Sequence, residues 1–513
     1  MFSKVHSVAL NGLDAYLVRV EADISDGLPQ FQMVGYLSSE VKEAGDRVRT
    51  ALRNTGIVLP PKRITVNLAP ASIRKAGTRF DLPVAAALLA SLGKIPGENL
   101  HETMLAGELS LNGQVLRVPG IMALVEAARN QGMKRCIVPR GNAAEGAVLK
   151  GIEVLGISSL EEFIQVTRHP EHAIPEQVAL EALLEQTQAL CEEDFSQING
   201  QSAVKRAAEV AAAGMHNLLL IGPPGSGKTM IAKRIPGILP PLSLEESLEI
   251  SKIYSVAGLL PEETPLLTQR PFRAPHHTVT AEALAGGGRV PIPGEISLSS
   301  RGILFLDELP EFRRNALEIL RQPLEERKVC ISRAAGTYRF PAEFMLVAAM
   351  NPCACGYYPD RNRCRCAERD VARYLGKISQ PLLDRIDICA EAPQISYEEL
   401  TGTGKNESSA QIRKRVEAAH LRQKERYRDL PIHFNGQLKG ELLKQYCPLN
   451  KEGEEILKQA FVKLNLSARA YHKIIRVART IADLEEKEQI EDSHILEAVR
   501  YRPPNRNEWI GEG

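Results

Sequence analysis

Residues 222–229 are the segment that most constrains how this chain can fold. They read Gly-Pro-Pro-Gly-Ser-Gly-Lys-Thr, after the apolar run 218–221 and before a helix-forming stretch. This is the pattern G-x-x-x-x-G-K-[ST] in the strand–loop–helix setting that it requires. The glycines allow backbone N–H groups to curl around phosphate oxygens, and the following helix adds its dipole. The sequence therefore predicts a parallel α/β sheet with a triphosphate site at one edge.

The side chains of this loop suit ATP with Mg²⁺. A lysine ammonium neutralises the β- and γ-phosphates, and a threonine hydroxyl ligates the metal. We expect nucleotide contacts from the whole loop, that is from Gly222, Pro223, Pro224, Gly225, Ser226, Gly227, Lys228 and Thr229.

Two further apolar runs end in polar side chains. Residues 303–306 are followed by Asp307 and Glu308. We expect Asp307 to hold Mg²⁺ and Glu308 to polarise the attacking water, because a buried strand would place both at the edge of the sheet where ligands bind. A third run, 344–350, ends at Asn351, which either helps to orient that water or only closes a turn.

The length of 513 residues suggests three folded units at about 150 residues each. Residues 1–168 alternate strand-like and helical runs, and 169–193 interrupt this pattern as a linker. Residues 194–395 repeat a strand–loop–helix pattern, which is typical of a parallel sheet with helical crossovers. Residues 396–513 are mostly helical and charged, which suits a small lid domain.

Several local patterns predict individual elements outside the nucleotide site. We expect strands at 17–22, 64–68 and 136–138, helices at 82–92, 124–130 and 176–190, and a mobile loop at 401–409.

Composition excludes some function classes but identifies no partner. The net charge is +1, so a polyanion would have to bind a local basic surface. There is no apolar run of 18 residues and no signal-peptide pattern at the start, so we expect a cytoplasmic protein without a membrane partner. The nine cysteines do not suggest a secreted disulfide scaffold.

Four of the cysteines form the pattern C-x-C-x₈-C-x-C, directly after Asn351. Four thiolates can close a tetrahedral Zn²⁺ site, and in the cytoplasm metal is favoured over a disulfide. Free or redox-sensitive thiols are the alternative, because C-x-C is less usual than C-x₂-C. The candidate ligands are Cys353, Cys355, Cys364 and Cys366.

Residues 328–340 contain two alternating runs around a small-residue turn, which predicts a β-hairpin. Arg333 and Arg339 would flank its tip, where they suit phosphate binding, and Tyr338 suits stacking on a base. Arg289, after three glycines, is a second basic candidate. The alternative is that these arginines are only solvated, so the residues alone support DNA binding weakly.

Taken together, these motifs resemble the magnesium-chelatase branch of AAA+ ATPases, and in particular the ComM/YifB family. The resemblance covers nearly the whole chain. It rests on 222–229, 303–308, Asn351, 270–278, 293–298 and 382–387.

The resemblance implies roles for further residues. Asn351 matches sensor 1, and Arg385 matches the arginine finger that reaches the ATP of a neighbouring subunit, which implies a hexameric ring. Arg469 matches sensor 2, which touches the γ-phosphate from the lid. For both arginines the alternative is a surface salt bridge. Residues 194–201 resemble the segment that packs on adenine. His276 and His277 have no role that the sequence indicates.

The function implied by the resemblance is that of a hexameric, ATP-driven DNA helicase. Such a motor would promote branch migration during integration of transforming DNA, with single-stranded or branched DNA and recombination proteins as partners. One alternative is a chelatase-type ATPase subunit that remodels a protein partner. Another is a regulatory ATPase scaffold that does not translocate.

Residues 1–168 resemble the proteolytic domain of Lon protease. The position of the Lon nucleophilic serine falls on Arg79, or on Asp81 after a small shift, and Met122 stands at the position of the Lon lysine. A Ser–Lys mechanism needs a hydroxyl and an amine. We therefore expect no peptidase activity, and we interpret the domain as an assembly or DNA-binding module.

Overall fold

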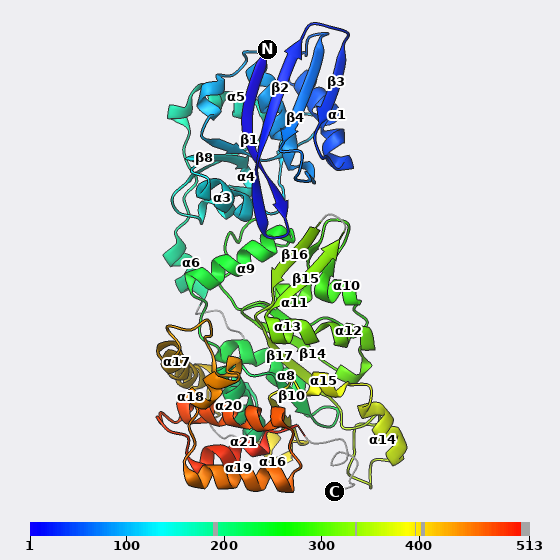
Figure 1. Cartoon of the computed structure of the whole chain (residues 1–513), viewed down its shortest axis with the longest axis vertical. Coiled ribbons are helices and arrows are strands. Elements are labelled where there is room, and N and C mark those ends of the chain that lie inside the picture. The colour runs from blue at the N-terminus through cyan, green and yellow to red at the C-terminus, as the bar shows by residue number, and fades with distance from the viewer. Residues whose placement is uncertain (188–192, 334–335, 396, 402–405, 504–513) are drawn as a thin grey trace.

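The computed structural model describes residues 1–187, 193–333, 336–395, 397–401 and 406–503. Three bodies follow one another along the longest axis of the molecule (Figure 1). The N-terminal domain lies at one end, the helical C-terminal region at the other, and the sheet with the glycine-rich loop between them. Within the described ranges, no helix combines the length and the apolar character needed to cross a membrane.

The N-terminal domain is built on a seven-stranded mixed sheet in the order β3-β4-β2-β1-β5-β8-β9. The pairs β1–β2 and β2–β4 are antiparallel, and the other neighbours are parallel. The strands are β1 (Phe2–Asn11), β2 (Asp14–Ser25), β3 (Gln30–Val34), β4 (Arg63–Ala69), β5 (Thr103–Leu105), β8 (Arg135–Pro139) and β9 (Glu153–Ile157), with a separate small pair β6 (Glu108–Leu109) and β7 (Val115–Leu116).

Helix α2 is buried on nearly all sides, which explains its unbroken Ala- and Leu-rich sequence. The strands and helices expected within residues 1–168 are all present, with boundaries shifted by a few residues. The helices are α1 (Ser39–Asn54), α2 (Asp81–Ser91), α3 (Ile121–Asn130), α4 (Arg140–Ala147) and α5 (Leu160–Arg168). Of the helix expected at 176–190, α6 (Leu180–Thr187) is described, and 188–192 lie outside the described residues.

The central body contains a five-stranded parallel sheet in the order β11-β14-β17-β10-β18. Its inner strands are buried and aliphatic, as expected for a sheet covered on both faces. The strands are β10 (Leu218–Ile221), β11 (Phe272–Arg273), β14 (Ile303–Leu306), β17 (Met345–Met350) and β18 (Ile388–Glu391). The prediction of a parallel-sheet core is confirmed.

Helices and two hairpins surround this sheet. The hairpins are β12 (Gly286–Gly287) with β13 (Ile292–Pro293), and β15 (Lys328–Arg333) with β16 (Gly336–Pro341). The helices are α7 (Ser202–Gly214), α8 (Lys228–Arg234), α9 (Leu244–Val256), α10 (Ala281–Ala285), α11 (Glu295–Leu298), α12 (Arg314–Ile319), α13 (Arg321–Glu326), α14 (Glu368–Leu375) and α15 (Gln380–Leu383).

The C-terminal region is helical, as predicted, and packs closely on the central body. One hydrophobic core runs from α7 and the sheet into the helices of the lid. The buried carboxylate of Asp483 binds Arg426, with contacts of 2.6 and 2.8 Å, and accepts a hydrogen bond from Asn435. The helices are α16 (Tyr397–Thr401), α17 (Ser409–Arg426), α18 (Glu441–Tyr446), α19 (Lys451–Lys463), α20 (Ala468–Leu484) and α21 (Asp492–Arg500). In the loop expected at 401–409, residues 402–405 lie outside the described residues.

The N-terminal domain docks on the central body through α3 and α9. The Gly120 N–H donates to the Ser255 carbonyl at 2.9 Å. Glu145, which is buried, accepts hydrogen bonds from the Met122 N–H at 3.1 Å and from the Ser255 hydroxyl. The position of the Lon lysine is thus a methionine beside this interface, and not a free amine near a nucleophile.

Candidate nucleotide site

The glycine-rich loop connects the carboxyl end of β10 to the first residue of α8. Gly225 and Gly227 have φ angles of +77° and +81°, which disfavour residues with a Cβ. Gly222 is required for a different reason, because a Cβ there would lie 2.2 Å from the Ala392 carbonyl oxygen. These three glycines therefore fix the path of the loop backbone.

Lys228 is 8% exposed and lies inside the loop. Its ammonium donates to the carbonyl oxygens of Gly222 at 2.7 Å and Pro223 at 2.8 Å, and to Asn351 Oδ1 at 3.2 Å. Burial lowers the pKa of this ammonium, and the charge of Asp307 partly opposes the shift. These three acceptors of the ammonium are neutral oxygens, and a bound phosphate would supply an anionic one.

Thr229 and Asp307 meet at the position expected for Mg²⁺. The Thr229 hydroxyl donates to Asp307 Oδ2 at 2.7 Å, and Asp307 Oδ1 accepts from the Glu308 N–H at 2.9 Å. Hydroxyl and carboxylate oxygens are the ligands that Mg²⁺ prefers, usually with substrate phosphates and water completing the shell. These residues therefore fit a Mg²⁺–ATP complex.

Asn351 follows β17, which pairs with both β10 and β14. The strand order thus places Asn351 between the glycine-rich loop and Asp307, where its amide oxygen already contacts Lys228. This is the placement that the sensor 1 assignment requires.

Glu308 has a partner that the sequence did not indicate. Its backbone is left-handed, with φ +52°, and its Oε2 lies 3.4 Å from Nδ1 of His277. The His277 ring is close to that of His276, with centroids 4.0 Å apart, and meets the edge of Phe312. Only the unexplained pair of adjacent histidines could have pointed to this contact in the sequence.

Residues 194–201 lie beside the glycine-rich loop. The Gln201 side chain donates to the carbonyls of Ser226 at 3.3 Å and Pro393 at 2.6 Å, which ties the loop to the end of β18. Asp194 accepts hydrogen bonds from the backbone of Ser409, at the start of α17. The segment thus connects the nucleotide loop to the lid.

Arg385 and Arg469 lie close together at the amino ends of the strands, on the side of the sheet away from the glycine-rich loop. Arg385 is bonded to the Arg321 carbonyl at 3.2 Å and forms an ion pair with Glu325. Arg469 reaches Asp384 Oδ2 at 3.1 Å. Within one subunit, both arginines therefore form ion pairs at the amino ends of the strands, whereas the glycine-rich loop is at the carboxyl ends.

The predicted hairpin exists as β15 and β16, with Arg333 and Arg339 exposed. Tyr338, in contrast, is 5% exposed, and its ring packs under the β1–β2 turn close to Gly12. The prediction that Tyr338 stacks on a base therefore disagrees with this placement, because the ring faces the protein core. Arg289 is exposed at the turn between β12 and β13.

The four cysteine sulfurs lie within 4.8 Å of one another. The separation is 3.3 Å from Cys353 to Cys355 and 3.8 Å from Cys353 to Cys364. Four thiolates at about 2.3 Å from a zinc ion would be about 3.8 Å apart, so the cluster fits a tetrahedral site. The N–H groups of Gly356 and Tyr358 point at the Cys353 sulfur, at 3.2 and 3.4 Å, and would stabilise a thiolate.

In the N-terminal domain, the guanidinium of Arg79 is buried, and burial lowers its pKa to about 10. Asp81 is also buried, and both of its oxygens accept hydrogen bonds from Arg47, at 2.7 and 2.8 Å. Neither position offers a hydroxyl nucleophile.

The fold and this site define a P-loop ATPase of the AAA+ class, in which Lys228 and Thr229 of the glycine-rich loop contact Asn351 and Asp307. Three family descriptions match the chain. "Magnesium chelatase, subunit ChlI" covers residues 194–400, "Subunit ChlI of Mg-chelatase" covers 20–142, and "Magnesium chelatase, subunit ChlI C-terminal" covers 406–502.

Two full-length relatives narrow this class. The chain is 43% identical to "Uncharacterized protein YifB" of Salmonella typhimurium, over 98% of this chain and 97% of that protein. It is 42% identical to "Competence protein ComM" of Haemophilus influenzae, over 97% of each. The chain belongs to the ComM/YifB family of magnesium-chelatase-like ATPases. Its N-terminal part is also similar to "Lon protease 2" of Bacillus subtilis, at 28% identity over 27% of this chain and 26% of that protein.

Proposed function

We propose that this protein is a cytoplasmic, ATP-driven motor that works as a ring of six subunits and moves DNA. In this proposal it is a helicase that promotes branch migration while transforming DNA is integrated, together with other recombination proteins. The observation that carries the proposal is the separation of the hydrolytic residues between two edges of one sheet, so that a site is complete only when a second subunit supplies Arg385.

The strand register supports this separation. Leu218 pairs with Ile388 and Ile221 with Glu391, so β10 and β18 begin at the same edge. Arg385 precedes β18, whereas the glycine-rich loop follows β10. The paired residues alone span about 10 Å at ~3.3 Å per residue. Arg385 and Arg469 therefore serve a neighbour's ATP, at which Arg385 is the finger and Arg469 the sensor 2 residue.

Hydrolysis then uses residues of both subunits. Lys228 binds the β- and γ-phosphates, and Thr229 with Asp307 holds Mg²⁺. Glu308 orients and polarises the attacking water, and Asn351 holds it in line. An arginine that enters from outside stabilises the charge that develops in the transition state.

Support for DNA comes from the exposed arginines and from one relative. Arg333 and Arg339 lie on opposite arms of the β15–β16 hairpin, with no acidic side chain bonded to either in the described residues. Arg289 lies on the adjacent hairpin. The relative named as a competence protein fits a role in DNA uptake or integration.

We also propose that the cysteine cluster holds a structural Zn²⁺. The four sulfurs come from a short loop after Asn351, and a metal would fix that loop close to the nucleotide site. The N-terminal domain has no peptidase role in this proposal, and it serves assembly or DNA binding.

The deciding experiment measures ATPase activity with and without DNA. Single-stranded and branched DNA should stimulate hydrolysis strongly, and sizing with ATP and Mg²⁺ should give a hexamer. If no DNA stimulates the enzyme and a protein partner does, the chelatase-type remodelling function replaces the motor. If neither stimulates it, a regulatory scaffold is the better interpretation.

A further inference from the structure

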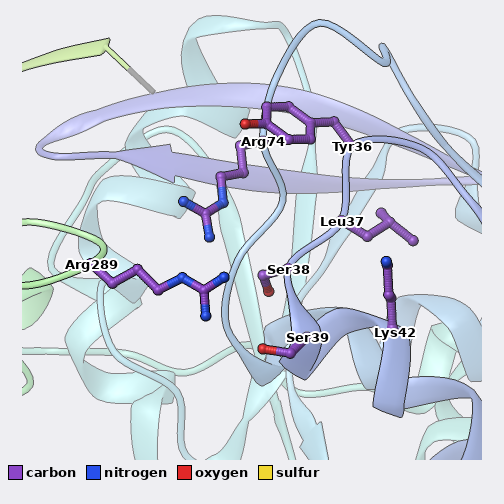
Figure 2. A pocket seen from close by; sticks show the side chains of 7 residues that line it. All are labelled: Tyr36, Leu37, Ser38, Ser39, Lys42, Arg74 and Arg289. Carbon is purple, nitrogen blue, oxygen red and sulfur yellow. The ribbon is translucent and has the colours of Figure 1, made fainter. Parts of the chain in front are cut away.

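A polar hollow of about 410 Å³ lies between the N-terminal domain and the β12–β13 hairpin of the central body. Figure 2 shows Arg74 and Arg289 pointing toward the same space from the two sides, with the hydroxyls of Ser38 and Ser39 beside it. The lining residues are Tyr36, Leu37, Ser38, Ser39, Lys42, Arg74 and Arg289.

The hollow carries an uncompensated positive charge. Within the part of the chain that the structure describes, Lys42, Arg74 and Arg289 form no ion pair and no side-chain hydrogen bond. The nearby acidic group is Glu40, and its pKa is lowered by the Ser38 hydroxyl and, more weakly, by Arg289 and Arg74. The residues that line the hollow thus include three cations and no carboxylate.

The floor of the hollow is the N-terminus of α1, a helix of 16 residues. Ser38 is the residue that precedes the helix, yet its side chain caps none of the helix N–H groups. Its hydroxyl is buried, in a residue 4% exposed, and the group that it stabilises is the Glu40 carboxylate. The positive end of the helix dipole, next to the cations that line the hollow, favours a bound oxyanion.

Backbone contacts fix this arrangement before any ligand binds. The Ser38 N–H donates to the Lys75 carbonyl, and the Lys75 N–H donates to the Tyr36 carbonyl, both at 2.9 Å. These two bonds hold Arg74 beside the start of α1. A site that is already ordered loses less entropy when it binds.

The hollow is also close to the proposed DNA-binding hairpin. A Cβ on Gly286 would lie 3.3 Å from Ile331 Cδ1, and one on Gly287 would lie 3.9 Å from an Arg333 nitrogen. Arg289 and Arg333 thus belong to adjacent hairpins, and Arg289 faces the N-terminal domain.

We propose that this hollow binds a phosphate group, and that its occupant in the motor is one phosphodiester of the DNA strand. The occupant rests on the proposed function, whereas the phosphate site itself does not. Arg74, Arg289 and Lys42 bind the phosphate oxygens at the N-terminus of α1, beside the Ser39 hydroxyl. The N-terminal domain thereby binds the DNA strand next to Arg333.

The test compares Arg74→Gln with Lys62→Gln, which removes the same charge from a lysine already paired with Asp26 at 2.8 Å. Affinity for single-stranded DNA is measured against salt concentration. Loss of one phosphate contact should reduce the slope of log K against log salt by about 0.7, and the control should not change it. ATPase activity without DNA should stay at the wild-type level.

Arg289→Gln should have the same effect, and the double variant with Arg74→Gln should lose no more than one phosphate contact, because both side chains bind the same group. A double variant with twice the loss would overturn the single shared site.

Inorganic phosphate, added at constant ionic strength, separates the two sources of the ligand. It should raise the melting temperature of the wild type more than that of Arg74→Gln, even if the wild type binds no DNA and the proposed function fails. If phosphate has this effect but the DNA salt slope is unchanged by Arg74→Gln, the DNA occupant is wrong. If neither measurement distinguishes Arg74→Gln from its control, the site does not exist.

Discussion

Replacement of Arg385 by alanine should stop hydrolysis without preventing nucleotide binding. In its own subunit the side chain contacts the Arg321 carbonyl at 3.2 Å and Glu325, far from the glycine-rich loop. An arginine supplied to a neighbour contributes about 10³–10⁵ in rate, so we expect kcat to fall at least ~10³-fold. Affinity for ATP, measured with a fluorescent nucleotide, should change little.

The same variant allows the position of the arginine to be determined from mixed rings. The Lys228→Ala subunit lacks the lysine of the glycine-rich loop but keeps Arg385. The Arg385→Ala subunit keeps the lysine but lacks the arginine. In random rings made from equal amounts of both, about one interface in four joins an intact loop to an intact arginine. Two inactive proteins should therefore recover about a quarter of the wild-type rate when mixed.

Glu325→Gln is the matched control, because it breaks the ion pair of Arg385 and leaves the guanidinium in place. This variant should hydrolyse ATP at close to the wild-type rate. The mixture is prepared without nucleotide, with two affinity tags to prove that mixed rings form. If mixed rings form and remain as inactive as their components, Arg385 acts within its own subunit, and the proposed division of the site is wrong.

Four further changes test the rest of the site. Lys228→Ala should lose ATP binding or hydrolysis, as measured by nucleotide binding and phosphate release. Glu308→Gln should retain ATP uncleaved and hold the ring together in sizing experiments, and rapid turnover would show that another group polarises the water. His277→Ala should lower kcat about fivefold, equivalent to about 1 kcal/mol, at unchanged ATP affinity, because it removes the contact that positions Glu308; His277→Asn should keep more of the rate, and a weakened ATP affinity would instead indicate a binding role. Protein purified without chelator should contain one zinc per chain by metal analysis, and Cys355→Ser should contain less; wild type without zinc would refute the metal site.

The sequence was sufficient to predict the position of a residue wherever short-range interactions fix the backbone conformation. A glycine-rich loop between an apolar strand and a helix has few conformations open to it, so Gly222 to Thr229 could be placed before the structure was known. The same holds for Asp307 and Asn351. Both follow buried strands, and the carboxyl ends of parallel strands meet at one edge.

The alternation of apolar and polar residues along a strand was less informative about which segments cover each face of a hairpin. Alternation along residues 328–340 predicted the hairpin, but it could not show that the β1–β2 turn would bury Tyr338. Gly12 and Tyr338 are far apart in sequence and meet only through docking of two domains. For the same reason, the sequence did not predict the contact of His277 with Glu308, because this contact joins two loops at the carboxyl ends of the strands.

By itself, then, the sequence determined the class of fold, the family and the loop that we expect to bind the triphosphate, because all of these depend on short-range geometry and on motifs. Only the tertiary structure decided which side chains lack a partner. Arg385 and Arg469 form ion pairs at the amino ends of the strands, whereas Arg74 and Arg289 converge from separate domains (Figure 2) and form no ion pair within the described residues. Charge compensation depends on distances in space, and these are set by packing between segments that the sequence does not connect.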